Sequence, residues 1–399
     1  MTSREPPPVD RFRPADLEQD WNALRSACPV AKTKSPGGTE LWLMSGHSDI
    51  RAVLADARFR VTPAGGEANE SIFQDPPEHT RLRGLVAGHF TLGRIEAYRP
   101  AIEAMADDLL GALEPAAEPV DLMEAFARPL SMNAICEIVG VPPADRELFR
   151  RLADQLLVSS AEAFDPTGWQ RLNEYVTSLI AARRREPRET VDLISHLLGG
   201  DDAGSLTDVE LTTMILGLPI AGYVSTANAI ALAFRHLLNG GWLDTLRSAA
   251  GTPELQRSFV EELLRMQSGD NGESMPRFAS ADVRWGEVTI AEGEMVVAPL
   301  IAANRDDTVF PAPETFDPHR AGLARHIAFG TGVHRCLGAN LARLELQCAL
   351  AAIVRADVGF ELALAWAHIP WSSNLFGDRY PDRLPVTVEK PVIARKNAG

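Results

Sequence analysis

Residues 211–234, LTTMILGLPIAGYVSTANAIALAF, form a run without any charged side chain between Glu210 and Arg235. A helix of about 20 apolar residues is long enough to span a bilayer. The centre of the run, AGYVSTAN, instead carries small and hydroxyl-bearing residues. No second run of this kind occurs, and no Lys/Arg-led apolar leader follows Met1. We therefore interpret the run as the long core helix of a globular protein and not as a membrane span.

Two local signals mark this helix. Thr207 and Glu210 have the T-x-x-E spacing of a capping box, which predicts that the helix begins there. Pro219 lies inside the run and removes a backbone donor to the carbonyl of Ile215. The sequence therefore predicts a kink just before Ala221.

The composition is that of a globular protein, with 45% hydrophobic and 23% charged residues among 399. The net charge of −15 would repel nucleic acid and anionic lipid. We expect neither a nucleic acid nor a membrane as partner, and we expect a cytoplasmic monomer that acts on a small molecule.

Apolar residues recur at three- and four-residue spacing through most of the chain, which predicts helices. The clearest are PAIEAMADDLLGALE, RLNEYVTSLIAARRRE, DVELTTMILGL, ELQRSFVEELLRM and LARLELQCALAAIV. VRWGEVTIAEGEMVVAP is typical of a hairpin, and LPVTVEK of a terminal strand. The predicted fold is mainly α with small β-sheets. Residues 1–14 are expected to form an arm, and residues 15–399 a single catalytic domain.

The four cysteines, Cys28, Cys136, Cys336 and Cys348, have no C-x-x-C spacing, which argues against a disulfide framework or a four-cysteine zinc site. Cys336 stands out in the segment HIAFGTGVHRCLGANLARLEL. There a loop containing Gly330 and Gly332 leads into a helix predicted to start near Leu337. A helix N-terminus favours a thiolate, so Cys336 is predicted to be a metal ligand, a nucleophile or a buried core cysteine. The other three cysteines are expected in the core.

The segment FGTGVHRCLG resembles the haem-binding loop of the cytochrome P450 family, whose pattern is F-x-x-G-x-x-x-C-x-G. Phe329, Gly332, Cys336 and Gly338 match it position for position. The resemblance implies the single-domain P450 fold and haem b, with Cys336 as the thiolate ligand of the iron. It also implies that Phe329, Gly330 and Gly338 lie against the cofactor. O2 and NAD(P)H-derived electrons would be used, the latter through ferredoxin and ferredoxin reductase.

Three further segments resemble the same family in the expected order. Glu262 and Arg265 of EELLR would form a structural triad with Arg320 of FDPHR, although such a pair is alternatively an ordinary surface ion pair. The DPPEHTRLR segment would begin a helix packed on the cofactor. By this resemblance four side chains would meet the haem propionates: His79, Arg83, Arg277 and His334. The first two are alternatively solvated helix charges.

The AGYVSTAN stretch resembles the family's distal helix, with the pattern A-G-x-[DE]-T-[ST]. Ala221 would leave room beside the cofactor, and Ser225 and Thr226 would be the catalytic hydroxyls. Val224 stands where the family has an acid that helps to deliver protons. Either Ser225 and water suffice for hydroxylation, or hydrogen comes from the substrate. Family members that join aromatic rings can lack the acid.

The segment between DARF and DPPEH is short, which favours an open pocket or a bulky substrate. The residues expected to line the substrate pocket are Phe73, Tyr223, Val224, Met275, Asn374 and Phe376. A basic patch on an acidic protein could dock a ferredoxin, and four arginines near the cysteine loop are candidates for it: Arg320, Arg325, Arg335 and Arg343. These arginines are alternatively used internally.

Three functions are consistent with these features. The first is an oxidoreductase that couples aromatic rings in a cyclic dipeptide or short peptide. The second is a monooxygenase that hydroxylates a terpenoid or polyketide-type metabolite. The third is a haem sensor that binds a ligand without turnover.

Overall fold

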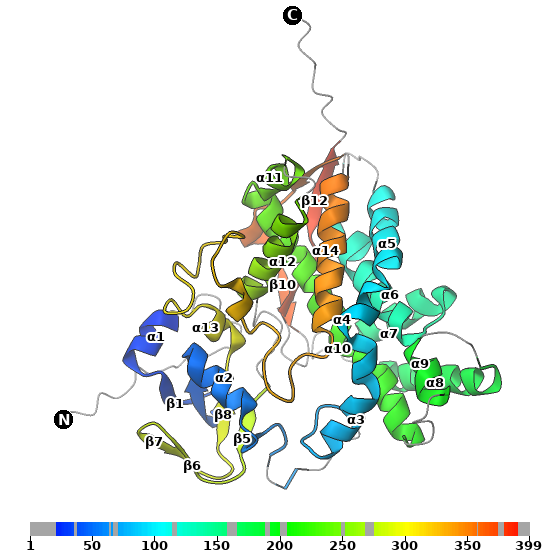
Figure 1. Ribbon diagram of the computed structural model, residues 1–399. Helices are drawn as coiled ribbons and strands as arrows, with labels where there is room; N and C mark the ends of the chain where they lie inside the picture. The colour runs from blue at the N-terminus through cyan, green and yellow to red at the C-terminus, as the bar shows by residue number, and fades with distance from the viewer. Residues whose placement is uncertain are drawn as a thin grey trace, which may run out of the picture.

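The computed structural model describes residues 21–35, 38–63, 65–66, 71–113, 118–157, 166–187, 192–199, 206–248, 252–267, 275–356, 358–373 and 379–389. The expected arm at residues 1–14 lies outside these ranges. The described chain is mainly helical with small sheets, which confirms the predicted fold class (Figure 1).

The helices follow the predicted periodic segments closely. They are α1 (Trp21–Ala27), α2 (His47–Ala55), α3 (Glu78–Ala87), α4 (Leu92–Glu96), α5 (Arg99–Gly111), α6 (Arg128–Val139), α7 (Arg146–Leu157), α8 (Pro166–Arg185), α9 (Leu193–Gly199), α10 (Asp208–Asn239), α11 (Trp242–Ser248), α12 (Pro253–Gln267), α13 (Leu300–Asn304) and α14 (Ala339–Arg355). Shorter helical turns are η1 (Gly88–Phe90), η2 (Met123–Ala127), η3 (Pro143–Asp145), η4 (Leu323–Arg325) and η5 (Trp366–His368).

The strands are β1 (Val30–Lys34), β2 (Glu40–Met44), β3 (Phe59–Arg60), β4 (Val120–Asp121), β5 (Arg277–Ala279), β6 (Val283–Trp285), β7 (Val288–Ile290), β8 (Met295–Val297), β9 (Gly359–Leu362), β10 (Trp371–Ser373), β11 (Arg379–Pro381) and β12 (Pro385–Glu389). The largest sheet has the order β1-β2-β8-β5-β3, in which β2 and β8 are parallel. The predicted hairpin appears as β6–β7, and the predicted terminal strand as β12 between β4 and β9.

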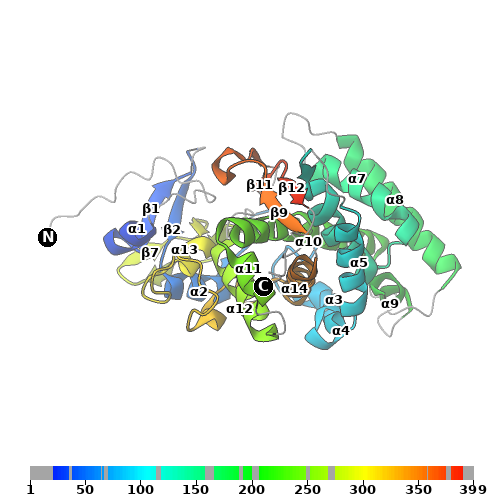
Figure 2. The ribbon, with the colours of Figure 1, turned by 90° about the horizontal axis from the view of Figure 1, so that it is seen from above.

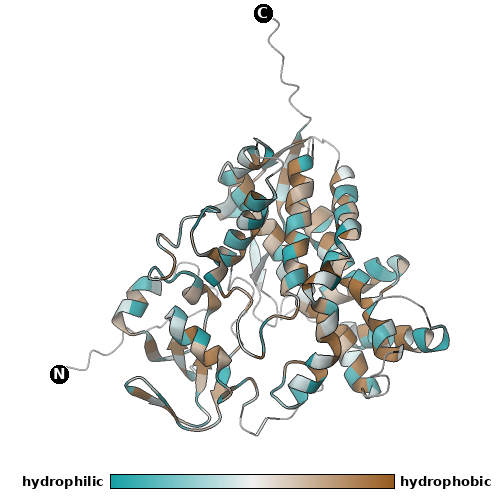
Figure 3. Cartoon of the chain, viewed as in Figure 1, coloured by the Kyte–Doolittle hydropathy of each residue, from teal (hydrophilic) through white to brown (hydrophobic). Residues whose placement is uncertain are grey.

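Two apolar cores organise these elements. The larger core packs α5, α6, α7, α8, α10, α12 and α14 together, and the smaller one lies between the β1–β2–β8 sheet, α2 and α13. Figure 2 shows α14 nearly end-on, with α10 running beside it. In Figure 3 most helices carry both brown, apolar and teal, polar residues, as expected for amphipathic helices of a globular protein.

The uncharged run forms α10, the longest helix of the described chain. Its capping box is present, because the Thr207 side chain accepts from the Glu210 backbone N–H and Glu210 accepts from the Thr207 N–H. The helix is continuous through Pro219, so the predicted distortion does not interrupt it. It is the one helix of the described chain that is long and apolar enough to cross a membrane, but 72% of its apolar window is buried inside the protein. This burial is that of a core helix, as predicted.

Candidate active site

The cysteine loop is held in shape by two glycines with positive φ, Gly330 at 65° and Gly332 at 76°. A Cβ on Gly332 would lie 2.3 Å from the carbonyl oxygen of Leu54, so the loop packs tightly on the end of α2. The Cys336 N–H donates to the carbonyl of Phe329 over 2.8 Å and closes the loop. The sequence pattern of two glycines therefore corresponds to a real conformational requirement.

Cys336 lies three residues before α14, whose N-cap is Gly338. The helix thus starts at Ala339, two residues later than expected. The Cys336 side chain is exposed in the chain alone, and no Cβ on Gly330 or Gly338 would meet an atom within 4 Å. A flat group could therefore approach this loop closely. The exposure excludes the interpretation of Cys336 as a buried core cysteine.

The other three cysteines differ from Cys336. Cys136 and Cys348 are fully buried, and burial raises the pKa of each thiol to about 12, which keeps them protonated and inert. The half-buried Cys28 thiol donates to the Val30 carbonyl, so its predicted place in the core is only partly correct.

The four side chains expected to meet the propionates do lie together. The rings of His79 and His334 are 4.4 Å apart between centroids. The Arg83 guanidinium donates to the Arg335 carbonyl over 2.6 Å, beside Cys336. Arg277 in β5 is 5% exposed and interacts electrostatically with His334. Residues up to 255 positions apart in the chain therefore converge.

Burial sets the charge of this group. It lowers the pKa of His334 to about 4, with His79 and Arg277 adding to the effect. It also lowers the pKa of His79, with Arg83 contributing. Both imidazoles are thus neutral at pH 7, whereas the two guanidinium groups stay positive. The group offers two positive charges and two neutral imidazoles.

This arrangement fits a cofactor that carries two carboxylates. His79 is 2% exposed, yet neither of its ring nitrogens has a hydrogen-bond partner among the described residues. Arg277 donates to the carbonyls of its own neighbours Met275 and Pro276. Buried donors of this kind require polar partners, and two propionates beside a thiolate ligand would supply them.

Asp75 is a member of this group that the sequence reasoning did not single out. Its carboxylate accepts from the backbone N–H groups of Val61 and Thr62, each over 3.0 Å, and lies 3.9 Å from Nε2 of His334. It occupies the first position of the DPPEH segment, so the signal was present in the motif. Asp75 anchors the loop between β3 and α3 beside the two imidazoles.

Three of the small and hydroxyl residues of α10, Ala221, Gly222 and Ser225, are not fully buried. From Leu211 to Leu238, Ala221 is the single exposed position of α10, which the structure describes throughout. The Ser225 hydroxyl donates to the Ala221 carbonyl over 3.0 Å, while Val224 and Thr226 are 7% and 5% exposed. The same face therefore presents Ala221 and the half-buried Ser225, as their four-residue spacing predicted.

The residues expected in the substrate pocket have different environments. Tyr223 is fully buried, and its hydroxyl donates to Asp154 over 2.7 Å, so it belongs to the core and its assignment to the pocket was wrong. Phe73 and Met275 are 42% and 37% exposed, which suits side chains at a pocket edge. Asn374 and Phe376 lie outside the described residues.

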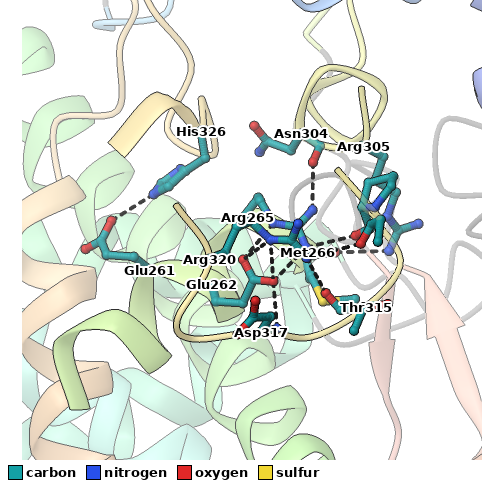
Figure 4. A network of polar contacts seen from close by, with 12 residues as sticks. Glu261, Glu262, Arg265, Met266, Asn304, Arg305, Thr315, Asp317, Arg320 and His326 are labelled. Carbon is teal, nitrogen blue, oxygen red and sulfur yellow. Dashed lines mark hydrogen bonds and ion pairs between the residues drawn. The ribbon is translucent and has the colours of Figure 1, made fainter. Parts of the chain in front are cut away.

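The Glu262–Arg265–Arg320 triad forms as predicted (Figure 4). Arg265 binds Glu262 through two hydrogen bonds of 2.7 and 2.8 Å, and both side chains are fully buried. Arg320 contacts Glu262 at 3.1 Å and donates to carbonyls of residues 311–315. The alternative of a surface ion pair is excluded, and the triad holds the chain before the cysteine loop in place.

The predicted patch of four arginines is largely used internally. Arg320 belongs to the triad, and Arg343 makes two hydrogen bonds to Glu261. Arg325 donates to the Val309 carbonyl and lies over the ring of Phe310. Arg325 and Arg335 are exposed, and Arg335 lies next to Cys336, so internal use accounts mainly for Arg320 and Arg343 and the docking surface stays a prediction.

Known proteins resemble this chain over nearly its whole length. The family model for cytochrome P450 matches residues 254–363. The chain is 38% identical to nocardicin C N-oxygenase of Nocardia uniformis subsp. tsuyamanensis, over 93% of the chain and 96% of that protein. It is equally identical to mycinamicin IV hydroxylase/epoxidase of Micromonospora griseorubida, over 97% of the chain and all of that protein.

Solved structures agree with these matches. A variant of the mixed-function P450 MycG in complex with mycinamicin V has a TM-score of 0.82 and 36% identity, covering 93% of this chain and 96% of that one. The structure of GfsF has a TM-score of 0.82 and 32% identity, covering 95% and 98%. With these relatives, and with the cysteine loop and the triad in place, this chain belongs to the cytochrome P450 family of monooxygenases, a family of haem-thiolate enzymes.

Proposed function

We propose that this protein is a haem-thiolate monooxygenase that inserts oxygen into a bulky secondary metabolite. The observation that carries the proposal is the position of Cys336, which lies exposed at the start of α14 and beside Arg83, His79 and His334. Haem b bound through this thiolate would supply the activation of O2. We expect the protein in the cytoplasm, with electrons from NAD(P)H reaching it through ferredoxin reductase and ferredoxin.

The residues around Cys336 would bind and orient the cofactor. Arg83 and Arg277 would neutralise the propionates, and the neutral imidazoles of His79 and His334 would donate hydrogen bonds to them. Phe329, Gly330 and Gly338 would form the surface beneath the ring, where the two glycines leave space for its close approach. These residues would hold the cofactor on the side of α14 that carries Cys336.

The distal face would be formed by α10. Ala221 would leave room beside the cofactor, and Ser225 is half-buried, whereas the neighbouring hydroxyl of Thr226 is buried. The Ser225 hydroxyl donates to the Ala221 carbonyl, so its oxygen is free to accept a hydrogen bond from water. If the hydroxyl turned away from this carbonyl, Ser225 could pass a proton on as it receives one from the water. Thr226 is 5% exposed and would support this turn from the core side.

Two observations support a bulky substrate. Phe73 and Met275 are large apolar side chains that remain exposed on segments flanking Arg277 and Asp75. The relatives named above act on nocardicin C and on mycinamicin IV. We infer a natural product of comparable size for this chain, of the terpenoid, polyketide or peptide type.

A second candidate function is oxidative coupling of aromatic rings, and Val224 favours it. The valine is 7% exposed and leaves this turn of α10 without a carboxyl group that could relay protons. A phenol or indole substrate that gives up its own hydrogen would remove the need for such a relay. The third possibility, a sensor without turnover, has no support from the N-oxygenase and hydroxylase relatives.

A product analysis with isotope-labelled dioxygen separates these functions. The purified protein, a ferredoxin and its reductase would be incubated with two panels, one of macrolides and terpenoids and one of aromatic cyclic dipeptides. Label in the product of any compound supports monooxygenation. A dehydrogenated, ring-joined product without label would establish coupling instead. If no compound accelerates electron uptake, the proposal of an enzyme of secondary metabolism fails.

A further inference from the structure

A network of hydrogen bonds connects α10, around its Ala221–Ser225 turn, to three neighbouring helices, α6, α7 and α14. Its centre is Tyr223, which is 0% exposed and held at both ends. The Tyr223 hydroxyl donates to Asp154 of α7 over 2.7 Å, and its backbone carbonyl accepts from the Ser131 hydroxyl of α6 over 3.0 Å. One residue of α10 is therefore tied to two other helices.

The hydrogen-bond network continues from Ser131 to Glu345 on α14. Ser131 has a single hydroxyl proton, which it directs to Tyr223 and, at 3.3 Å, to the Gly222 carbonyl. The Ser131 hydroxyl also hydrogen-bonds the Glu345 side chain, and this contact partly offsets the effect of burial on the Glu345 pKa. The Glu345 side chain is 1% exposed, and burial raises its pKa well above the usual range, in agreement with a neutral carboxylic acid.

On the other side, Asp154 also binds Arg150 over 2.9 Å, and Arg150 contacts Glu124 of η2. Arg150 therefore holds the Asp154 carboxylate in the position in which it accepts the hydrogen bond from Tyr223. The connected elements are α7, α10, α6 and α14, and the last of these begins directly after Cys336. The network runs from α7 to the helix that positions the cysteine.

Tyr223 lies between Ala221 and Ser225, two residues from each. Successive residues of an α-helix are turned by about 100°, so the direction of Tyr223 also fixes the direction of its neighbours. A rotation of α10 that freed Tyr223 would turn Ala221 and Ser225 away from the face on which they now lie. The hydrogen bonds to Asp154 and Ser131 oppose such a rotation.

We infer that Tyr223 is a positioning residue for the oxidation site. Its hydrogen bonds with Asp154 and Ser131 keep Ala221 and Ser225 directed toward the cofactor. The inference rests on the proposed function, because it assigns the open face of α10 to the distal side of the haem. The role that the family gives to an acid on α10 is not transferred to Tyr223. Its task is geometric.

The test compares Tyr223→Phe with a matched control in the purified holoprotein. Tyr175 on α8 makes a similar hydrogen bond, 3.0 Å to Asp145 of η3, so Tyr175→Phe removes an equivalent hydroxyl elsewhere. Hydrogen–deuterium exchange of peptides covering residues 218–228 and 150–157 is the first readout. Binding of imidazole to the ferric haem, followed by the Soret band, is the second.

We expect Tyr223→Phe to speed exchange in both segments and to weaken imidazole binding by about 3- to 10-fold, the range of one buried hydrogen bond. Tyr175→Phe should change neither value. Asp154→Asn keeps an oxygen that accepts from Tyr223 but loses the ion pair with Arg150, whereas Asp154→Ala loses both contacts, so Asp154→Asn should speed exchange at residues 218–228 less than Asp154→Ala does. This partial rescue separates a positioning hydrogen bond from simple packing.

Unchanged exchange and unchanged imidazole binding in Tyr223→Phe would overturn the inference, as would equal effects in Tyr175→Phe. If Tyr223→Phe does not fold, the comparison of Asp154→Asn with Asp154→Ala decides by the same criteria. A wild-type protein without a thiolate-ligated haem would end the proposed function. The exchange data would still report on the hydrogen-bond network, so the two failures are distinguishable.

Discussion

Gly332 occupies the tightest point of the cysteine loop, with a φ of 76° and the Leu54 carbonyl 2.3 Å from where a Cβ would lie. We expect Gly332→Ala to displace the loop and to lower the fraction of protein that retains haem after gel filtration by at least about tenfold, because both backbone strain and a backbone clash oppose the alanine. Gly330→Ala is the control. Its φ is 65°, but the added Cβ would meet nothing within 4 Å, so it should cost only about 1 kcal/mol. Equal haem retention in the two variants would contradict the tight packing on α2.

Glu345 gives a prediction about pH. Its pKa is raised in the folded protein, so the folded state holds a proton that the unfolded state releases above its ordinary pKa. Stability should therefore fall as pH rises from the unfolded pKa to the folded one, by about 1.4 kcal/mol per pH unit from this group, and then level off. Glu345→Gln removes this titration, so its melting temperature relative to wild type should increase with pH. A difference that is constant between pH 5 and pH 8 would show that Glu345 is ionised in the fold.

The sequence predicted the positions of some residues of the site but not of others. Cys336 was marked by its glycine-rich loop, and the resemblance brought His79, Arg277 and His334 to it. No periodicity in the chain could have done so, because these residues come from different elements. Tyr223 was misplaced, because a central helix has two functional sides and the sequence does not say which one meets Asp154 on α7.

Among the elements, α12 depends on the buried ion pairs of Glu262. We expect Glu262→Gln to destabilise the fold by about 3–5 kcal/mol, because Arg265 and Arg320 would keep their buried charges without a carboxylate. Urea unfolding followed by circular dichroism would measure it. Glu254→Gln on the same helix removes an exposed pair with Arg257 and should change stability by less than about 1 kcal/mol. A small effect of Glu262→Gln would contradict a structural role for the triad.

The predictability of the elements followed the range of the interactions that form them. The start of α10 was predicted because its capping box is local. The hairpin β6–β7 was predicted because its two strands are adjacent in sequence. The parallel pairing of Trp42 with Val296 was not predicted, because it joins segments more than 250 residues apart and leaves no local pattern.

The molecule as a whole has a net charge of −15, yet Arg335 is an exposed cation beside the cysteine loop. If an acidic ferredoxin docks there, Arg335→Glu should slow reduction by about tenfold at low ionic strength, and the difference should shrink as salt screens the contact. Stopped-flow reduction kinetics would measure it, with an unchanged ferric spectrum as the check on the haem. Arg284→Glu in the exposed β6–β7 hairpin makes the same charge change elsewhere and should have no comparable effect. Equal rates for both variants would exclude docking at Arg335.

The convergence of Cys336, the imidazoles of His79 and His334 and the guanidinium groups of Arg83 and Arg277 is a property of the whole fold, and one measurement can test it. The purified protein, loaded with haem and reduced by dithionite, would be exposed to carbon monoxide and its absorption spectrum recorded. We expect the long-wavelength Soret band of a thiolate-ligated ferrous carbonyl complex, and its loss in Cys336→Ala. A spectrum typical of histidine ligation, or a band that persists without Cys336, would contradict the assignment of this cysteine as the haem ligand.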